Sequence, residues 1–355
     1  MTRAARRPNG LPASLVVQTS FLGDVVLTTP LVRELARRGP VDVVVRPDAA
    51  PLLAHNPDVR CLVVYDKRGR DRGLGGLWRL ARRLRAGGPY AAAYLAQGSP
   101  RSAALALLAG CRARVGFDTS RNARPLYTRV VRFRRDRHHA ERLWALAQPD
   151  AEPAADAIRP RLYPGADERA AVDALLAPFA AGTADVAGGF VALAPGSVWA
   201  TKRWPFYAEL GAALAGDWPV VVVGGPGDRE LAAAVVAACP AGRALDATGR
   251  LSLLASAELL ARARLLVTND SSPLHLASAV GTRTLAIFGP TVPAFGFGPL
   301  APGSQTAGVD DLACRPCDAH GPRVCPLGHW RCMREQAPDL VAARVRAMLA
   351  SLPIS

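Results

Sequence analysis

Two successive series of aliphatic runs, each alternating with helix-like segments, constrain the fold of this chain more than any other feature of its sequence. In the first series, the aliphatic runs predict short buried strands, and the segments between them predict amphipathic helices. The predicted strands cover residues 15–17, 41–45, 61–65 and 92–96, and the predicted helices cover 25–38, 74–85, 102–108 and 138–148. Strands that alternate with helices form parallel sheets with crossover helices.

Residues 149–164 separate the two series. This segment holds four prolines and little periodicity, which is typical of a linker. The second series predicts strands at 190–193, 220–223, 265–268 and 284–288, and helices at 167–179, 205–214, 228–238, 258–263, 273–280 and 339–352. Residues 110–137 are rich in arginine and show no clear pattern. We therefore predict an α/β protein with two doubly wound, Rossmann-like domains around a cleft, in which ligands bind at the carboxyl ends of the strands.

The composition excludes several classes of protein. With 355 residues, 50% of them hydrophobic, the chain can form two buried cores and is unlike an intrinsically disordered protein. No apolar run approaches the roughly 18–20 residues that a membrane-spanning helix needs. The apolar stretch after the Arg-rich N-terminus is too short for a signal peptide. Seven cysteines without an export signal therefore favour a reducing compartment.

The charge balance favours anionic partners. The chain has 44 basic and 29 acidic residues, which gives a formal net charge of +15. Such a field attracts nucleic acid, phosphorylated sugars or an anionic membrane face. Only Lys67 and Lys202 are lysines, and in an Arg-rich sequence a retained lysine suggests a place where a guanidinium does not fit.

The junction after the first predicted strand carries a candidate base. Gly23 allows a tight turn, and Asp24 lies at the start of the following helix. An aspartate in this position is commonly a helix cap. It can also be a carboxylate that faces the cleft and acts as a general base.

Three later junctions resemble anion-binding loops. One junction, between a predicted strand and a helix start, carries Ser197, Thr201 and Lys202. A second junction of the same kind carries Asp270, Ser271 and Ser272, and His275 lies one turn further on. Hydroxyls, an ammonium group and helix N-termini together suit a phosphate group. The third junction, residues 224–228 (GGPGD), lacks the phosphate-loop pattern, and a tight structural turn is its favoured interpretation.

Three segments in this order resemble the bacterial heptosyltransferases of glycosyltransferase family 9, and most closely the lipopolysaccharide heptosyltransferase II type within it. They are SFLGDVVLTTPLVREL, PGSVWATKRWP and VTNDSSPLHLASAVGTRTLAIFGPT, and HNPDV at residues 55–59 also resembles the family. Ser272 departs from the pattern, because many members have glycine there.

The resemblance implies a GT-B fold. Residues 1–155 would form an acceptor domain, 156–335 a donor domain, and 336–355 a C-terminal helix that packs back on the N-terminal domain. The implied donor is ADP-L-glycero-D-manno-heptose, and the implied acceptor is the Kdo–heptose inner core on lipid A at the cytoplasmic face of the inner membrane. The implied reaction inverts the sugar and requires neither a metal nor another cofactor.

The resemblance also assigns roles to residues. Asp24 matches the general base, Lys202 the phosphate-binding lysine, and Asp270 with His275 the donor-site motif. The expected donor set is Ser197, Thr201, Lys202, Asp270, Ser271, Ser272 and His275. The expected acceptor set is Gly23, Arg68, Arg79 and Arg121. The arginines come from two basic segments, 67–85 and 112–137, whose alternative interpretation is an ordinary solvated surface.

Two questions stay open at this stage. Cys314, Cys317, Cys325 and Cys332 have spacing that suits either a structural zinc ion or a group of reduced, packed cysteines. The function has three alternatives: a family 9 enzyme for another sugar or glycan, a GT-B-like sugar-nucleotide epimerase or hydrolase, and a nucleic-acid-binding protein. The last is disfavoured because the basic segments lack interleaved aromatic residues.

Overall fold

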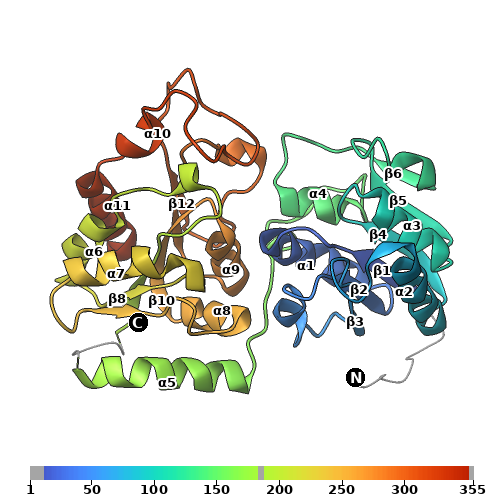
Figure 1. Ribbon diagram of the computed structural model, residues 1–355, viewed down its shortest axis with the longest axis horizontal. Coiled ribbons are helices and arrows are strands. Elements are labelled where there is room, and N and C mark those ends of the chain that lie inside the picture. Colours follow the sequence, from blue (N-terminus) through green and yellow to red (C-terminus); the bar gives the residue numbers. More distant parts are fainter. Residues whose placement is uncertain (1–11, 183–187, 352–355) are drawn as a thin grey trace. The chain divides into compact units, whose positions relative to one another are not determined.

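A computed structural model describes residues 12–182 and 188–351 and divides the chain into two units, Met1–Tyr163 and Pro164–Ser355 (Figure 1). The Arg-rich start of the chain and Leu352, the predicted end of the last helix, lie outside the described residues. None of the helices within the described ranges is long and apolar enough to cross a membrane.

The first unit is built on a six-stranded parallel sheet in the order β3-β2-β1-β4-β5-β6. The strands are β1 (Ala13–Val17), β2 (Val41–Val45), β3 (Cys61–Val64), β4 (Tyr90–Leu95), β5 (Ala113–Phe117) and β6 (Arg129–Val131). The helices are α1 (Leu22–Ala36), α2 (Gly73–Gly87), α3 (Pro100–Leu108) and α4 (His139–Ala145), with short 3₁₀ helices η1 (Ala50–Leu53) and η2 (Arg124–Leu126).

The second unit repeats the same topology. Its sheet has the order β12-β11-β10-β7-β8-β9, which is the order of the first sheet read from the opposite edge. The strands are β7 (Phe190–Ala194), β8 (Val220–Val222), β9 (Ala244–Asp246), β10 (Ala263–Asn269), β11 (Thr284–Ile287) and β12 (Gln305–Ala307). The helices are α5 (Ala166–Gly182), α6 (Tyr207–Ala215), α7 (Arg229–Ala238), α8 (Leu253–Ala261), α9 (Ser272–Val280), α10 (Arg331–Arg334) and α11 (Pro338–Ala350), with 3₁₀ helices η3 (Ala200–Lys202), η4 (Pro226–Asp228) and η5 (Pro293–Phe295).

Each unit has its own apolar core between its sheet and its helices. In the first unit, the buried face of α2 contributes Leu77, Leu80 and Leu84. In the second, the central strands β7 and β10 are packed under α6 and α11. The predicted fold class, two doubly wound α/β units, is therefore confirmed.

Three sequence-based expectations about organisation need correction. The Arg-rich residues 110–137 contain β5 and β6, which pair with β4 to complete the sheet. The first unit extends beyond residue 155 because Arg33 on α1 donates hydrogen bonds to the carbonyls of residues 156, 157 and 159. The C-terminal helix α11 belongs to the second unit and not to the N-terminal domain, because its residues Val341 and Val345 are buried in the core under α6.

Candidate functional sites in the two units

In the first unit, polar side chains gather where the strand order reverses, between β1 and β4. Ligands of doubly wound sheets bind at such a switch point, outside the carboxyl ends of the strands. Gln18 and Thr19 follow β1, and Gln97 follows β4. The Thr19 amide donates to Gln97 Oε1 at 3.2 Å, and Gln18 Nε2 donates to Thr28 Oγ1 at 3.0 Å. These hydrogen bonds fix the loop that leads into α1.

Asp24 lies in the first turn of α1, where one of its carboxylate oxygens has a capping role. Oδ2 accepts hydrogen bonds from Ser20 Oγ at 2.5 Å and from the Phe21 amide at 3.3 Å. Oδ1 lies 3.5 Å from His139 Nε2, and the Asp24 side chain remains 18% exposed. The helix-cap interpretation therefore holds for Oδ2, while Oδ1 faces His139.

Two further side chains reach this switch point. The sequence did not single out His139, and it singled out Lys67 only as one of the two retained lysines. His139 comes from the start of α4, 115 residues after Asp24. Lys67 Nζ donates to the Thr19 carbonyl at 3.3 Å. Burial, together with the neighbouring charges of Arg46, Arg68 and Arg101, lowers the pKa of Lys67. His139 approaches Asp24 through the packing of α4 on α1, which no local pattern records, whereas Lys67 lies in the loop that follows β3.

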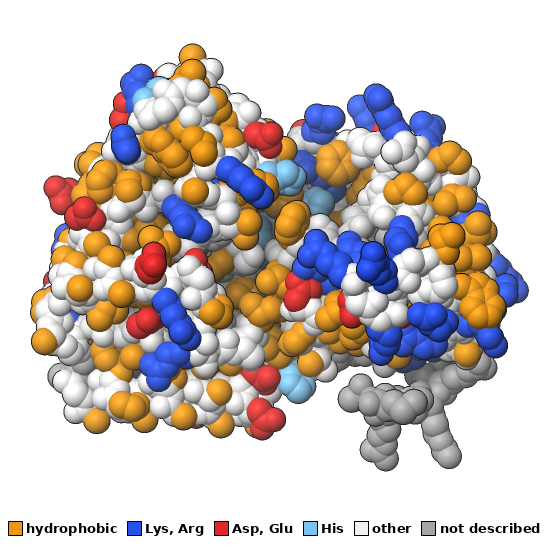
Figure 2. All heavy atoms as spheres, viewed as in Figure 1, with side chains coloured by type: hydrophobic (Ala, Val, Ile, Leu, Met, Phe, Trp, Pro, Cys, Tyr) orange, Lys and Arg blue, Asp and Glu red, His pale blue; other side chains and the backbone are white. Residues whose placement is uncertain are grey.

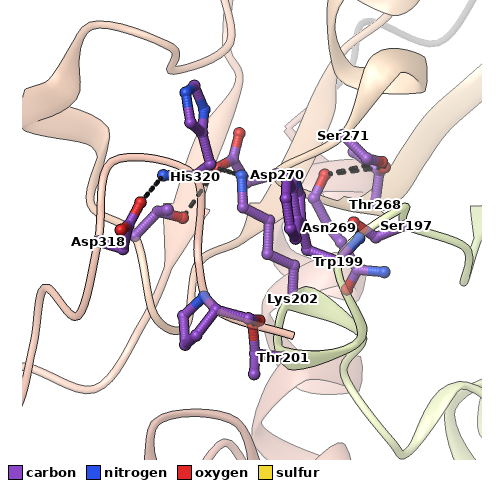
Figure 3. A network of polar contacts seen from close by, with 12 residues as sticks. Ser197, Trp199, Thr201, Lys202, Thr268, Asn269, Asp270, Ser271, Asp318 and His320 are labelled. Atoms are coloured by element: carbon purple, nitrogen blue, oxygen red, sulfur yellow. Dashed lines mark hydrogen bonds and ion pairs between the residues drawn. The ribbon is translucent and has the colours of Figure 1, made fainter. Parts of the chain in front are cut away.

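The corresponding switch point of the second unit lies between β7 and β10 and holds a nearly buried ion pair. Lys202 Nζ lies 2.6 Å from Asp270 Oδ2, and the two side chains are 10% and 11% exposed (Figure 3). Thr291 Oγ1 donates to the same oxygen at 2.8 Å. Lys202 belongs to η3 after β7, and Asp270 directly follows β10. The structure therefore brings together two residues that are 68 positions apart and that the sequence predicted for one site.

Asn269 connects the loops that carry this pair. Its side chain is fully buried, and its Oδ1 accepts hydrogen bonds from the Trp204 amide at 3.1 Å and from Tyr207 OH at 3.3 Å. Its Nδ2 donates to the Pro195 carbonyl at 2.9 Å. The loop after β7 is thereby held against the end of β10.

The other predicted donor residues are distributed around the start of α9. Ser271 is the residue before α9, Ser272 is its first residue, and Ser197 lies in the loop held by Asn269, where its Oγ accepts a hydrogen bond from the Trp199 amide. The first amides of a helix carry partial positive charge and suit an anion. His275 is buried one turn further on and contacts the ring of Phe297 edge to face. The donor-binding role of His275 remains a prediction.

The Cys-rich loop between β12 and α10 covers part of the Lys202 side chain. Thr201 Oγ1 donates to the Pro322 carbonyl, and the Cys317 amide donates to the Pro290 carbonyl at 2.9 Å. Gly321 has φ +80°, and a Cβ atom there would lie 3.3 Å from Lys202 Cε. The backbone of this loop can approach the lysine because residue 321 has no side chain.

The three cysteines of this loop and Cys332 of α10 do not converge as a metal site in the structure. Within residues 12–182 and 188–351, no group of three or more His, Cys, Asp or Glu side chains is arranged to hold a metal ion. Cys317 is exposed, whereas Cys332 is buried, and burial raises the pKa of the Cys332 thiol to about 11. A structural zinc ion at Cys314, Cys317, Cys325 and Cys332 remains a prediction.

The turn at residues 224–228 is structural, as its sequence indicated. The Gly225 amide donates to Asp228 Oδ2 at 2.8 Å. The same carboxylate fills the space that a side chain at Gly196 or Gly224 would need. Asp228 is therefore directed into its own turn.

Comparison with known proteins decides the family. A model of glycosyltransferase family 9 (heptosyltransferase) matches residues 77–328. The lipopolysaccharide heptosyltransferase 1 of Pseudomonas aeruginosa is 30% identical over 94% of this chain and 97% of its own length. This chain belongs to glycosyltransferase family 9. The family resemblance of the sequence motifs is thereby confirmed, and the protein is a glycosyltransferase.

Solved structures agree with the fold of this family 9 glycosyltransferase. A family 9 glycosyltransferase from Veillonella parvula superimposes with a TM-score of 0.82 at 22% identity and covers 96% of this chain and 98% of its own. The Escherichia coli ADP-heptose LPS heptosyltransferase II gives a TM-score of 0.76 at 24% identity, with coverages of 95% and 98%. The relatives thus include enzymes of both type 1 and type 2.

The predicted acceptor-binding residues come from different elements of the first unit, and their role remains a prediction. Gly23 is buried beside Asp24 in α1, whereas Arg68, Arg79 and Arg121 are exposed on a loop, on α2 and on another loop, respectively. Figure 2 shows lysine and arginine side chains spread over the visible face of the first unit. On α2, arginine side chains surround Trp78, which is 52% exposed. The Arg82 guanidinium carbon lies 4.7 Å from the centre of the Trp78 ring. These residues line a groove of about 520 Å³.

Proposed function

We propose that this glycosyltransferase transfers L-glycero-D-manno-heptose from ADP-heptose to the inner core of lipopolysaccharide, with inversion at the anomeric carbon. The names of its relatives support a heptose donor and a lipopolysaccharide acceptor. The observation that carries the proposal is the Lys202–Asp270 pair at the N-terminus of α9. A cation beside a helix N-terminus is an arrangement that suits a nucleotide diphosphate.

In this proposal the second unit binds the donor. The diphosphate contacts Lys202, the Ser272 amide at the start of α9 and the Thr201 hydroxyl, which gives up its hydrogen bond to the Pro322 carbonyl. Asp270 accepts hydrogen bonds from sugar or ribose hydroxyls. Lys202 then exchanges part of its contact with Asp270 for the phosphate. Positive charge at the leaving diphosphate lowers the barrier, because negative charge develops there as the glycosidic bond breaks. These groups fill the role that a metal ion has in metal-dependent transferases.

Asp24 of the first unit acts as the general base. An inverting transfer is a single in-line displacement with an oxocarbenium-like transition state. The acceptor hydroxyl loses its proton to Asp24 Oδ1 as its oxygen bonds to the anomeric carbon and ADP departs. The capping contacts at Oδ2 support this role, because they hold the carboxylate in place without occupying its second oxygen.

We further propose that the first unit works at the anionic, cytoplasmic face of the inner membrane. The exposed surface of α2 combines Leu74 and Trp78 with Arg79, Arg82 and Arg83. Aromatic and aliphatic side chains among basic ones favour the interface of an anionic leaflet. Such a location would place the enzyme beside a lipid-linked acceptor.

The decisive experiment presents the purified enzyme with ADP-, GDP- and UDP-sugars and a lipid A–Kdo–heptose acceptor. Mass spectrometry should detect the acceptor with one added heptose only when ADP-heptose is supplied. A parallel thermal-shift measurement should show stabilisation by ADP-sugars, about 2.7 kcal/mol at a concentration 100 times the Kd. Transfer from a GDP- or UDP-sugar, or release of free sugar without acceptor, would exclude the proposed donor or the proposed reaction.

A further inference from the structure

The start of α4 is held so that two adjacent histidines have different surroundings. His138 precedes the helix, and its Nδ1 accepts a hydrogen bond from the Ala140 amide at 3.1 Å. His139 is the first residue of the helix and is directed at α1. Arg142 fixes this geometry, because its guanidinium donates to the carbonyls of Arg134 at 2.7 Å and Arg135 at 2.6 Å.

His139 and Asp24 face each other in a partly buried contact. The distance from Nε2 to Oδ1 is 3.5 Å, and the side chains are 13% and 18% exposed. Oδ2 of Asp24 already accepts two hydrogen bonds, from Ser20 and Phe21. The imidazole therefore approaches the oxygen that those two donors leave available. Catalytic hydrogen bonds are often long in unliganded enzymes and shorten in the substrate complex.

The geometry also excludes the reverse assignment of roles. If His139 were the base, one ring nitrogen would have to reach the acceptor while the other contacted Asp24. The Nδ1 atom of His139 is buried from solvent. Only the carboxylate of this pair can therefore meet a hydroxyl that arrives from outside the unit.

We infer that His139 is a positioning residue for Asp24, an inference that rests on the proposed function. The Nε2–H group donates to Oδ1 and, together with Ser20 and Phe21 at Oδ2, fixes the plane of the carboxylate. The remaining lone pair of Oδ1 then points at the acceptor hydroxyl. During transfer the hydroxyl proton moves to Asp24, and His139 keeps its own proton.

The test compares two side chains of similar length, one with an N–H donor and one without. His139→Met should lower kcat roughly 10- to 100-fold, the range expected for losing a hydrogen bond to a charged group, while the KM for ADP-heptose stays unchanged. His139→Gln should recover most of kcat, because its amide nitrogen can occupy the place of Nε2. His138→Ala is the matched control, and it should change the melting temperature but not kcat.

Coupling to Asp24 completes the experiment. In an Asp24→Asn background, which is slow under the proposed function, His139→Met should cause no further loss of kcat. Equal activity of the Met and Gln variants, or an undiminished effect of His139→Met in the Asp24→Asn enzyme, would overturn the inference. Full activity of Asp24→Asn alone would instead overturn the proposed base, which is a distinguishable result.

Discussion

At the scale of single residues, the proposed function gives Asp24 both a structural and a chemical role. Asp24→Asn keeps an oxygen that can accept hydrogen bonds from Ser20 and Phe21, so the fold and ADP-heptose binding should be preserved. The amide cannot take a proton, and kcat should fall roughly 10²- to 10⁴-fold. Steady-state kinetics and a melting curve check both halves of this prediction. Near-normal turnover would mean that Asp24 is only a helix cap.

Lys202 is the residue whose chemical identity should matter most for the donor. Lys202→Ala removes the charge beside the α9 N-terminus and should weaken ADP binding, measured by calorimetry, and slow transfer. Lys202→Arg should restore only part of the affinity, because the lysine side chain is confined between Asp270 and the backbone of Gly321. Unchanged affinity in both variants would remove Lys202 from the donor site.

Residues near strand ends could be identified from the sequence, whereas residues brought in by packing could not. Asp24, Lys202 and Asp270 each follow a recognisable aliphatic run, so their places at the two switch points were predictable. His139 begins a helix after a long Arg-rich stretch, and its contact depends on how α4 packs on α1. A single sequence carries no record of that packing.

At the scale of elements, the loop over Lys202 depends on one glycine. Gly321→Ala would add a Cβ atom 3.1 Å from Pro290 and 3.3 Å from Lys202 and Thr201, at a φ of +80°. The loop should shift, and the KM for ADP-heptose should rise several-fold. Gly328→Ala is a matched control, since its φ is +70° but nothing lies within 4 Å of the added atom. Equal KM values for the two variants would contradict this prediction, because backbone strain alone would then explain any rise in KM.

The exposed face of α2 makes a separate prediction about the acceptor. Leu80 and Leu84 are buried, and Arg79, Arg82, Arg83 and Arg85 are exposed. Replacing these four arginines with glutamine should raise the KM for a lipid-linked acceptor and leave the donor KM unchanged. Each charge near an anionic leaflet contributes about 1 kcal/mol, and salt screens that contribution.

Two measurements control this prediction. The defect of the quadruple variant should shrink at high ionic strength and disappear with a short, delipidated acceptor. A weaker affinity for ADP-heptose, or a defect that salt does not affect, would contradict the assignment of α2 to the membrane.

Strands with long aliphatic runs were predictable, and the three-residue strands β6, β9 and β12 at sheet edges were not. The remaining edge strand, β3, was predicted at residues 61–65 because its aliphatic run is recognisable. The aliphatic runs of β1, β2, β7 and β10 are hydrophobic enough to specify strands buried on both faces. The edge strands β6, β9 and β12 have three residues each and include Arg129, Asp246 and Gln305. Pairing with an existing neighbour, rather than their own sequence, makes these residues strands.

At the scale of the whole molecule, two units with the same strand order have different predicted tasks. The proposal assigns donor binding to the second unit alone. Hydrogen exchange should therefore show that ADP protects amides in residues 195–204 and at the start of α9, because bound ligand suppresses local opening. Residues 18–24 of the first unit should exchange at unchanged rates. ADP-dependent protection confined to the first unit would mean that the first unit, and not the second, binds the donor.

The buried side chain of Asn269 affects how much conformational entropy the second unit loses when it binds a ligand. Its buried amide has partners on the loop after β7 and at the start of α6, so these segments cannot separate without leaving a polar group unsatisfied. The loops that carry Lys202 and Asp270 are consequently ordered when the chain folds. A nucleotide that enters this site meets preorganised groups, and little conformational entropy is lost from these loops at each turnover.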